Sequence, residues 1–119
     1  LCTPGTHVFM QGELTERHCT NAHAPTYHGD EWVTVDLVVR AGTSIAHVIA
    51  GDTVLSYERP VVGGGAVNGY DEAAKHDGES LTCGYIAPPS ESHPVQFRQG
   101  LVRPLSRGRC SWTRLLCRC

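Results

Sequence analysis

Apolar and polar positions alternate most regularly between Glu31 and Arg40, with a period of two. One side of this segment is entirely apolar and is formed by Val33, Val35, Leu37 and Val39. The other side is mixed and is formed by Trp32, Thr34, Asp36, Val38 and Arg40. A period of two is that of an extended strand, because successive side chains point to opposite faces. The pattern predicts a strand with one face in a core.

Two hairpins are predicted around this strand. Residues 7–19 place short extended runs on either side of Gln11-Gly12, and the glycine suits a tight turn. Residues 44–50 and 53–59 flank Gly51-Asp52, which predicts a two-residue Gly-X loop. Pairing Ala50 with Thr53 then puts Tyr57 on an apolar face and sends His47 to the more polar one. His47 is therefore expected outside the core.

The remaining chain contains a long loop and further strands. Residues 60–80 show no sustained period, although DEAAKH suits one helical turn. Strands are expected at 81–87 and 95–102, and Pro104 is expected to end the second. With 13 glycines, 7 prolines and recurrent valines, the composition favours turns and strands. We expect an all-β fold in one domain, because 119 residues are too few for two ordinary ones.

Charge is distributed unevenly along the chain. Residues 1–98 hold all 12 acidic residues and five basic ones, whereas 99–119 hold five arginines and no acid. Residues 106–119 therefore read as a basic, cysteine-containing tail outside the fold. The arginines lack interleaved aromatic residues beyond Trp112, so nucleic acid is not an expected partner. No run approaches the ~18 apolar residues that cross a bilayer, so no membrane span is expected either.

Six cysteines are present at 2, 19, 83, 110, 117 and 119. No C-x-x-C pair occurs, so the spacing is not that of a structural zinc site. The first hairpin brings Cys2 close to Cys19, which fits either a disulfide or two buried thiols.

The chain has seven histidines, a high number for a residue whose side chain gains or loses a proton near neutral pH. His7 and His18 are expected to face each other across the first hairpin within one position of register. Such a pair suits a divalent metal or a proton shuttle, and His47 or His93 would join it if the strands are neighbours. Glu91 and His93 bring a carboxylate and an imidazole to one turn. The alternative is that most of these histidines are solvated or capping residues.

Two longer segments together resemble a known family. They are YHGDEWVTVDLVVRAGTSIAHVIAGDTVLSYERP at 27–60 and GYIAPPSESHPVQFR at 84–98. In order, spacing and terminal motif they are similar to the C-terminal half of the 3-keto-disaccharide hydrolase family, a bacterial domain with a concanavalin-like jelly-roll fold. The resemblance covers residues 1–105 and implies an incomplete β-sandwich of that kind.

This chain departs from the family in two ways. It has Pro88-Pro89 where the family has Leu-Gln, and proline removes hydrogen-bond donors from a strand ladder. The family domain is also nearly twice as long, and its front half, expected to supply catalytic carboxylates, is not in this sequence. The only methionine is Met10, so a segment, including a signal peptide, is expected to precede Leu1.

The resemblance implies an enzyme that cleaves glycosides carrying a ketone at C3. A base removes the acidic C2 proton, an enolate forms, and the anomeric group leaves. A protonated histidine, an arginine or a divalent metal would stabilise the enolate. The catalytic candidates are His7, His18, Glu91 and His93. The substrate-binding candidates are Tyr27, Trp32 and His47, although Trp32 also fits a half-buried strand aromatic.

Two other functions remain open at this stage. The same sheet would serve a non-catalytic carbohydrate-binding or surface module, because fold does not fix function. An inactive truncated fragment is the third hypothesis. Half a sandwich leaves one apolar sheet face without a partner, so self-association is expected. The family resemblance places the protein in the periplasm, in the secreted fraction or at the cell surface.

Overall fold

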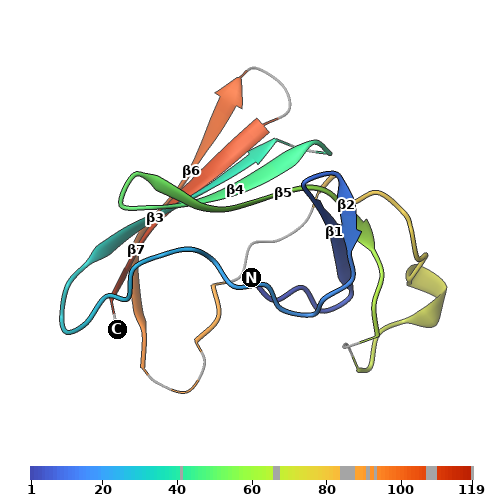
Figure 1. The fold of residues 1–119 in the computed structure, drawn as a ribbon, viewed down its shortest axis with the longest axis horizontal. Coiled ribbons are helices and arrows are strands. Elements are labelled where there is room, and N and C mark those ends of the chain that lie inside the picture. Colours follow the sequence, from blue (N-terminus) through green and yellow to red (C-terminus); the bar gives the residue numbers. More distant parts are fainter. Residues whose placement is uncertain are drawn as a thin grey trace.

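The protein is a chain of strands with one short 3-10 helix (Figure 1). The structure, a computed structural model, describes residues 1–40, 42–65, 68–83, 88–90, 92, 94–106 and 110–118, and for 105, 106 and 110–118 it describes the backbone. The elements within these residues are β1 (Thr6–Met10), β2 (Glu13–Thr15), β3 (Val33–Arg40), β4 (Ser44–Ile49), β5 (Asp52–Val62), η1 (Glu72–Ala74), β6 (Gln96–Ser106) and β7 (Cys110–Arg118).

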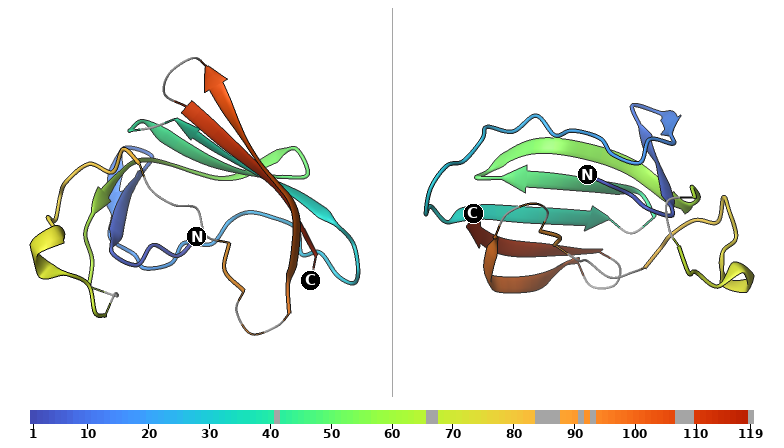
Figure 2. Two further views of the ribbon diagram at one scale, coloured as in Figure 1. Left: turned by 180° about the vertical axis from the view of Figure 1, so that it is seen from behind. Right: turned by 90° about the horizontal axis from the view of Figure 1, so that it is seen from below.

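All of these strands belong to one antiparallel sheet with the order β2-β1-β5-β4-β3-β7-β6. The prediction of an all-β fold is confirmed. The described residues form a single sheet, so the second layer of a jelly roll stays a prediction. The two views of Figure 2 show β3, β4, β6 and β7 side by side, with the β1–β2 hairpin turned away from them.

The strand predicted at 31–40 is confirmed as β3, but the expectation that one face lies in a core is wrong, because side chains of both faces are half-buried. Leu37 lies opposite His47 and Val39 lies opposite Ile45, and the apolar positions of β3 follow one face. All four apolar side chains on this face are half-buried. The sheet face that carries them is therefore also the face of His47.

The turn between β4 and β5 differs from the prediction by one residue. The two-residue loop is Ala50-Gly51, with φ of 51° and 99°, and Ile49 pairs with Asp52. Positive φ at both central residues is the mark of a type I′ turn, whose twist matches that of the flanking strands. Because a one-residue slip exchanges the two faces of a strand, His47 and Tyr57 share one face, and their predicted separation onto opposite faces is wrong. His47 is half-buried and lies outside the core, as predicted.

A bulge adds a second irregularity to the same hairpin. His47 pairs with Leu55 and Val48 pairs with Thr53, so Val54 is the extra residue on β5. Its carbonyl accepts a hydrogen bond of 3.0 Å from the His23 N–H, which ties the loop between β2 and β3 to β5. Val54 is buried, and the bulge therefore places an apolar side chain in the core.

The first hairpin forms around Gln11-Gly12 as predicted. Met10 pairs with Glu13 and Val8 with Thr15, and β2 ends at that residue. On its other side β1 pairs with the second half of β5, where the register shifts between His7 and Phe9. Figure 1 shows β5 turning at this point from the main sheet into the hairpin. The long bent strand joins the two parts of the sheet.

The predicted tail at 106–119 is wrong in its central part. Cys110–Arg118 forms β7, which pairs with β3 over its whole length and with β6 on the other side. A change in charge along a sequence does not prevent pairing, because ladder hydrogen bonds are made by the backbone. The valine-rich β3 gains its second neighbour from this segment.

Two further boundaries need correction. Pro104 lies inside β6 instead of ending it, and it is tolerated because β6 is one of the two edge strands of the described sheet. Leu81–Cys83 form no strand, and the rest of the predicted strand at 84–87 lies outside the described residues. The predicted helical turn near residue 72 is confirmed as η1.

The core of the described chain is small. Its buried hydrophobic residues are Val8, Val54 and Tyr57, at 2%, 6% and 8% exposure. All three lie on β1 or β5, where the sheet bends. In the part of the chain described above, no helix has the length and apolar character required to span a membrane.

Candidate functional site

A side-chain hydrogen bond joins His47 of β4 to Tyr57 of the neighbouring strand β5. His47 Nε2 lies 3.1 Å from Tyr57 Oη, and the two ring centroids are 5.5 Å apart at 51°. β4 positions the imidazole and β5 the phenol, and the pairs His47–Leu55 and Ile45–Tyr57 are two positions apart in the ladder, so the two rings are diagonal neighbours on one face. His47 was predicted as a substrate-binding residue, whereas Tyr57 was missed because the predicted register made it only a core residue.

Burial shifts the pKa values of His47 and Tyr57 in the directions that favour their uncharged forms. It lowers the pKa of His47, and the positive amino terminus lowers it further. Burial also raises the pKa of Tyr57 to about 12. Both groups are therefore neutral near pH 7. When Nε2–H donates to Tyr57 Oη, Nδ1 is a free base and the tyrosine hydroxyl can donate elsewhere.

The two shifts predict a loss of stability at both ends of the pH range. His47 has a lower pKa in the folded chain than its ordinary 6.5, so stability falls as pH drops from about 6.5 through the folded pKa. Tyr57 has a folded pKa of about 12 against an ordinary 10.0. Stability therefore falls by on the order of 2 kcal/mol as pH rises from 10.0 towards about 12.

Urea unfolding at acid, neutral and alkaline pH measures this dependence. Tyr57→Phe removes the ionising hydroxyl and keeps the ring. The free energy of unfolding of this variant is therefore expected to fall less than that of the wild type between neutral and alkaline pH. An equal alkaline loss in the wild type and in Tyr57→Phe would assign the effect to other groups.

The amino-terminal segment is joined to the chain after β2 by a disulfide. Cys2 and Cys19 are bridged, with Cα atoms 4.1 Å apart, so the disulfide alternative is confirmed. Both cysteines are exposed, and the alternative of two buried thiols is wrong. Backbone hydrogen bonds flank the bridge on both sides, from Thr3 N–H to the His18 carbonyl and from Thr20 N–H to the Leu1 carbonyl.

His7 and His18 do not form the predicted facing pair. His7 lies on β1 opposite Val61, and its ring packs against Gly63. His18 lies beyond the end of β2, where its carbonyl accepts from Thr3. The group of potential metal ligands in the described residues joins His18 to the two bridged cysteines, without His7. The predicted divalent-metal pair is therefore not assembled, because β2 ends before it reaches His18.

The contact between His7 and Gly63 carries a stability prediction. A Cβ at Gly63 would lie 2.6 Å from His7 Nδ1, and Gly63 is buried. Gly63→Ala is therefore expected to lower the free energy of unfolding by about 1 to 3 kcal/mol through overpacking. Gly65→Ala is the matched control, because a Cβ there meets nothing within 4 Å, and its expected effect is within about 0.5 kcal/mol.

A double variant identifies the cause of that loss. Adding His7→Ala to Gly63→Ala removes the ring that the new methyl group meets, so the two changes are expected to be non-additive. Chemical denaturation of the four proteins gives the coupling. Strict additivity, or equal losses at Gly63 and Gly65, would contradict the packing argument.

The predicted aromatic binding residues lie apart from the His47–Tyr57 pair in the strand order. Trp32 directly precedes β3 and is half-buried, and the Arg98 guanidinium of β6 lies 3.9 Å from the centroid of its ring. Tyr27 lies in the loop between β2 and β3 and is half-buried. Glu91 and His93 lie outside the described residues, so their predicted roles stay predictions.

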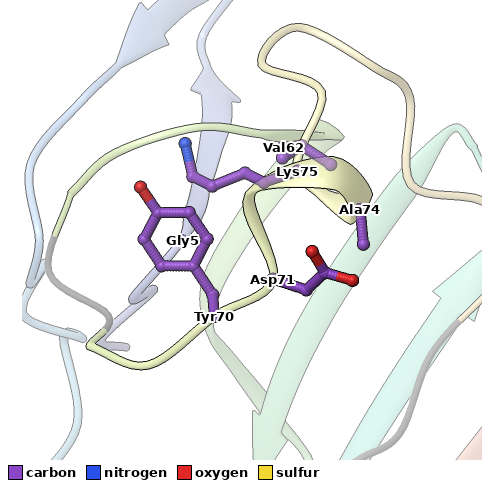
Figure 3. Close-up of a pocket in the computed structure, with 6 residues that line it drawn as sticks. All are labelled: Gly5, Val62, Tyr70, Asp71, Ala74 and Lys75. Atoms are coloured by element: carbon purple, nitrogen blue, oxygen red, sulfur yellow. The ribbon is translucent and has the colours of Figure 1, made fainter.

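A shallow pocket lies beside η1, and its lining includes none of the predicted site residues that the structure describes (Figure 3). Figure 3 shows the Tyr70 ring and the Lys75 side chain alongside one another, with Asp71 across from them. Lys75 Nζ is 5.5 Å from the Tyr70 ring centroid and forms an ion pair with Asp77. The volume of about 240 Å³ is below that of an ordinary small-molecule site. Its lining is Gly5, Val62, Tyr70, Asp71, Ala74 and Lys75.

In comparisons with known proteins, no protein-family model, no curated protein and no solved structure matches this chain.

Proposed function

We propose that this chain is part of a glycosidase that acts on 3-keto-glycosides, with His47 as the general base and Tyr57 as the donor to the enolate oxygen. The observation that carries the proposal is the 3.1 Å contact between His47 Nε2 and Tyr57 Oη. The reaction needs a neutral base and a neutral hydrogen-bond donor close together. Burial favours that protonation state in both residues.

The chemistry is an elimination followed by addition of water. With its ring proton on Nδ1, His47 uses Nε2, the nitrogen beside Tyr57 Oη, to remove the C2 proton. The electron pair forms an enolate whose oxygen at C3 accepts a hydrogen bond from Tyr57. The enolate then expels the anomeric oxygen, which takes the proton back from His47, and a C1–C2 double bond remains. Water adds across this bond and gives the free 3-keto sugar. Neither step requires a metal ion.

The Cys2–Cys19 disulfide supports a secreted, periplasmic or cell-surface location for this reaction, because disulfides persist in oxidising compartments. Self-association stays a prediction. The half-buried apolar positions of β3 and the exposed Phe97, Leu101 and Val102 of β6 are consistent with a further layer or a second copy covering the sheet.

The test is release of p-nitrophenol from p-nitrophenyl 3-keto-glucoside by the purified chain. We expect release faster than the spontaneous elimination, a primary isotope effect when C2 carries deuterium, and no change with a chelator. p-Nitrophenyl glucoside is the matched control, because its C2 proton is not acidic without the ketone. Release at the spontaneous rate would refute the enzymatic proposal for this chain.

A second candidate is a carbohydrate-binding module without catalysis. It is favoured by the contact of Arg98 with the half-buried Trp32, because sugar rings stack on aromatic faces and their hydroxyls bond to guanidinium groups. Binding of the 3-keto-glucoside without accelerated release, lost in Trp32→Ala and kept in His47→Gln, would support this candidate over the first.

A further inference from the structure

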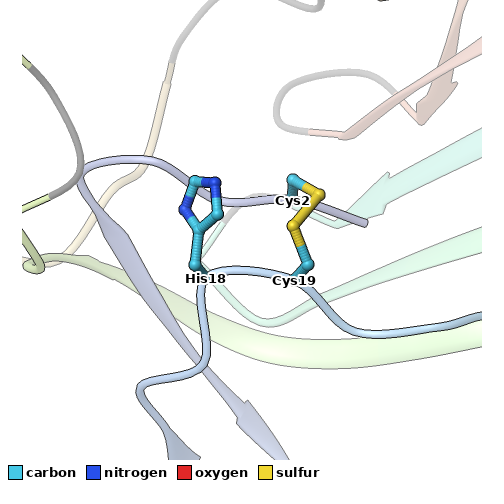
Figure 4. A group of neighbouring side chains, drawn as sticks. All are labelled: Cys2, His18 and Cys19. Atoms are coloured by element: carbon cyan, nitrogen blue, oxygen red, sulfur yellow. A yellow bond between two sulfur atoms is a disulfide. The ribbon is translucent and has the colours of Figure 1, made fainter. Parts of the chain in front are cut away.

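Cys2, His18 and Cys19 form an exposed cluster of side chains that bind transition metals. One ligand atom from each residue lies within 4.8 Å of the others. Figure 4 shows the imidazole of His18 beside the bridged sulfurs. The side chains of the consecutive residues His18 and Cys19 lie on the same side of the backbone. In the oxidised chain the two sulfurs are bonded to each other, so they are not thiolate ligands.

The backbone around this cluster is held by bonds that do not depend on the disulfide. Thr3 N–H donates to the His18 carbonyl at 2.8 Å, and Thr20 N–H donates to the Leu1 carbonyl at 2.7 Å. The amino terminus donates to the Thr20 carbonyl at 2.8 Å. These bonds join the two segments in addition to the disulfide, so we expect them to hold Cys2 and Cys19 opposite each other in the reduced chain.

We propose that the reduced chain binds one Zn²⁺ through Cys2, His18 and Cys19, so that the cluster alternates between a disulfide and a zinc site. A dithiol reductant supplies two electrons and two protons to the disulfide and becomes a cyclic disulfide itself. Zn²⁺ then displaces the two thiol protons to solvent and binds two thiolates and the neutral imidazole. Water takes the fourth position of the tetrahedron.

The donor set and the spacing both suit zinc. Thiolate and imidazole are its preferred ligands, with bonds of about 2.3 Å to sulfur and about 2.0 Å to nitrogen. Ligand atoms around a tetrahedral zinc lie roughly 3.5 to 4 Å apart, within the spread of this cluster. All three residues are exposed, which gives the ion a path from solvent.

Cobalt is the probe for the experiment, because Co²⁺ bound to thiolates in a tetrahedral site absorbs strongly. The protein used in this experiment is a variant with serine in place of Cys83, Cys110, Cys117 and Cys119, so that Cys2 and Cys19 are its only cysteines. A phosphine reduces the disulfide and becomes a phosphine oxide, and it leaves no competing thiol. We expect one Co²⁺ per reduced chain, with sulfur-to-cobalt charge-transfer absorption that Zn²⁺ abolishes, and no such absorption in the oxidised chain.

His18→Ala in the same background is expected to weaken cobalt binding by about tenfold or more, because it removes one of three ligands. His23→Ala is the matched control on the neighbouring exposed loop and is expected to leave the affinity unchanged. Absence of the charge-transfer band, or equal affinity with and without His18, would overturn the proposal.

Thermal unfolding distinguishes a site in the folded chain from binding to an unfolded one. Zn²⁺ is expected to raise the Tm of the reduced chain with the logarithm of its free concentration above Kd, and to leave the Tm of the oxidised chain unchanged. A reduced chain that binds cobalt but shows no such increase in Tm would refute a preformed site.

Discussion

Replacing both Cys2 and Cys19 by serine is expected to lower the free energy of unfolding by about 3 kcal/mol. The bridge joins residues 17 positions apart, and breaking it returns the closure entropy of that loop to the unfolded chain. The loss is a large fraction of the ~5 to 15 kcal/mol that stabilises an ordinary domain. It matters more here because the described core contains only Val8, Val54 and Tyr57.

Urea unfolding measures this loss as a shift in the midpoint at constant slope. Both cysteines are exposed, so serine leaves no buried polar group and no cavity in their place. Cys83→Ser is the matched control, because Cys83 is a free and exposed cysteine, and its expected effect is within about 0.5 kcal/mol. Equal midpoints for the wild type and the double variant would mean that the amino-terminal segment adds nothing to stability.

The strands were predictable where a short-range pattern determines them. The strand at β3 and the Gln11-Gly12 turn each depend on a pattern within about ten residues of sequence, and both are found in the structure. The Cys2–Cys19 bridge follows from the same hairpin, although the sequence alone left buried thiols as an alternative. Local pattern and turn chemistry carried these predictions.

The register of the β4–β5 hairpin was not predictable in the same way. Ala50-Gly51 and Gly51-Asp52 are both acceptable two-residue loops, because each places the glycine at a position that needs positive φ. The choice between them reverses the faces of His47. The bulge at Val54 shifts the pairing again. The His47–Tyr57 contact depends on both features, so no motif in the sequence indicates it.

The position of β7 was missed for a different reason. Its arginines and cysteines mark a change in composition, and composition says little about which backbone will complete a ladder. The predicted pairing of His7 with His18 failed because the hairpin is shorter than its sequence pattern, with β2 ending at Thr15. Long-range pairing with β3 decided the first case, and the early end of a local hairpin decided the second.

His47→Gln is expected to lower kcat for elimination of a 3-keto-glucoside by about 10² to 10⁴, the contribution of a general base. Glutamine is close in size and can still hydrogen-bond to Tyr57 Oη, so the contact with β5 is kept while the base is lost. KM is expected to change little. In the wild type, kcat/KM is expected to fall as pH drops below 6.5, since the pKa of His47 is lowered and protonation removes the base.

Two further variants separate the roles at this site. Tyr57→Phe keeps the buried ring and removes the donor to the enolate oxygen, so kcat is expected to fall by about 10² to 10³. His23→Gln changes an exposed histidine whose backbone N–H bonds to β5, and it is expected to leave kcat unchanged. Free imidazole is expected to restore part of the activity of a smaller variant, His47→Gly, because it supplies the missing base. Full activity in His47→Gln, or an equal loss in His23→Gln, would place the base elsewhere in the chain.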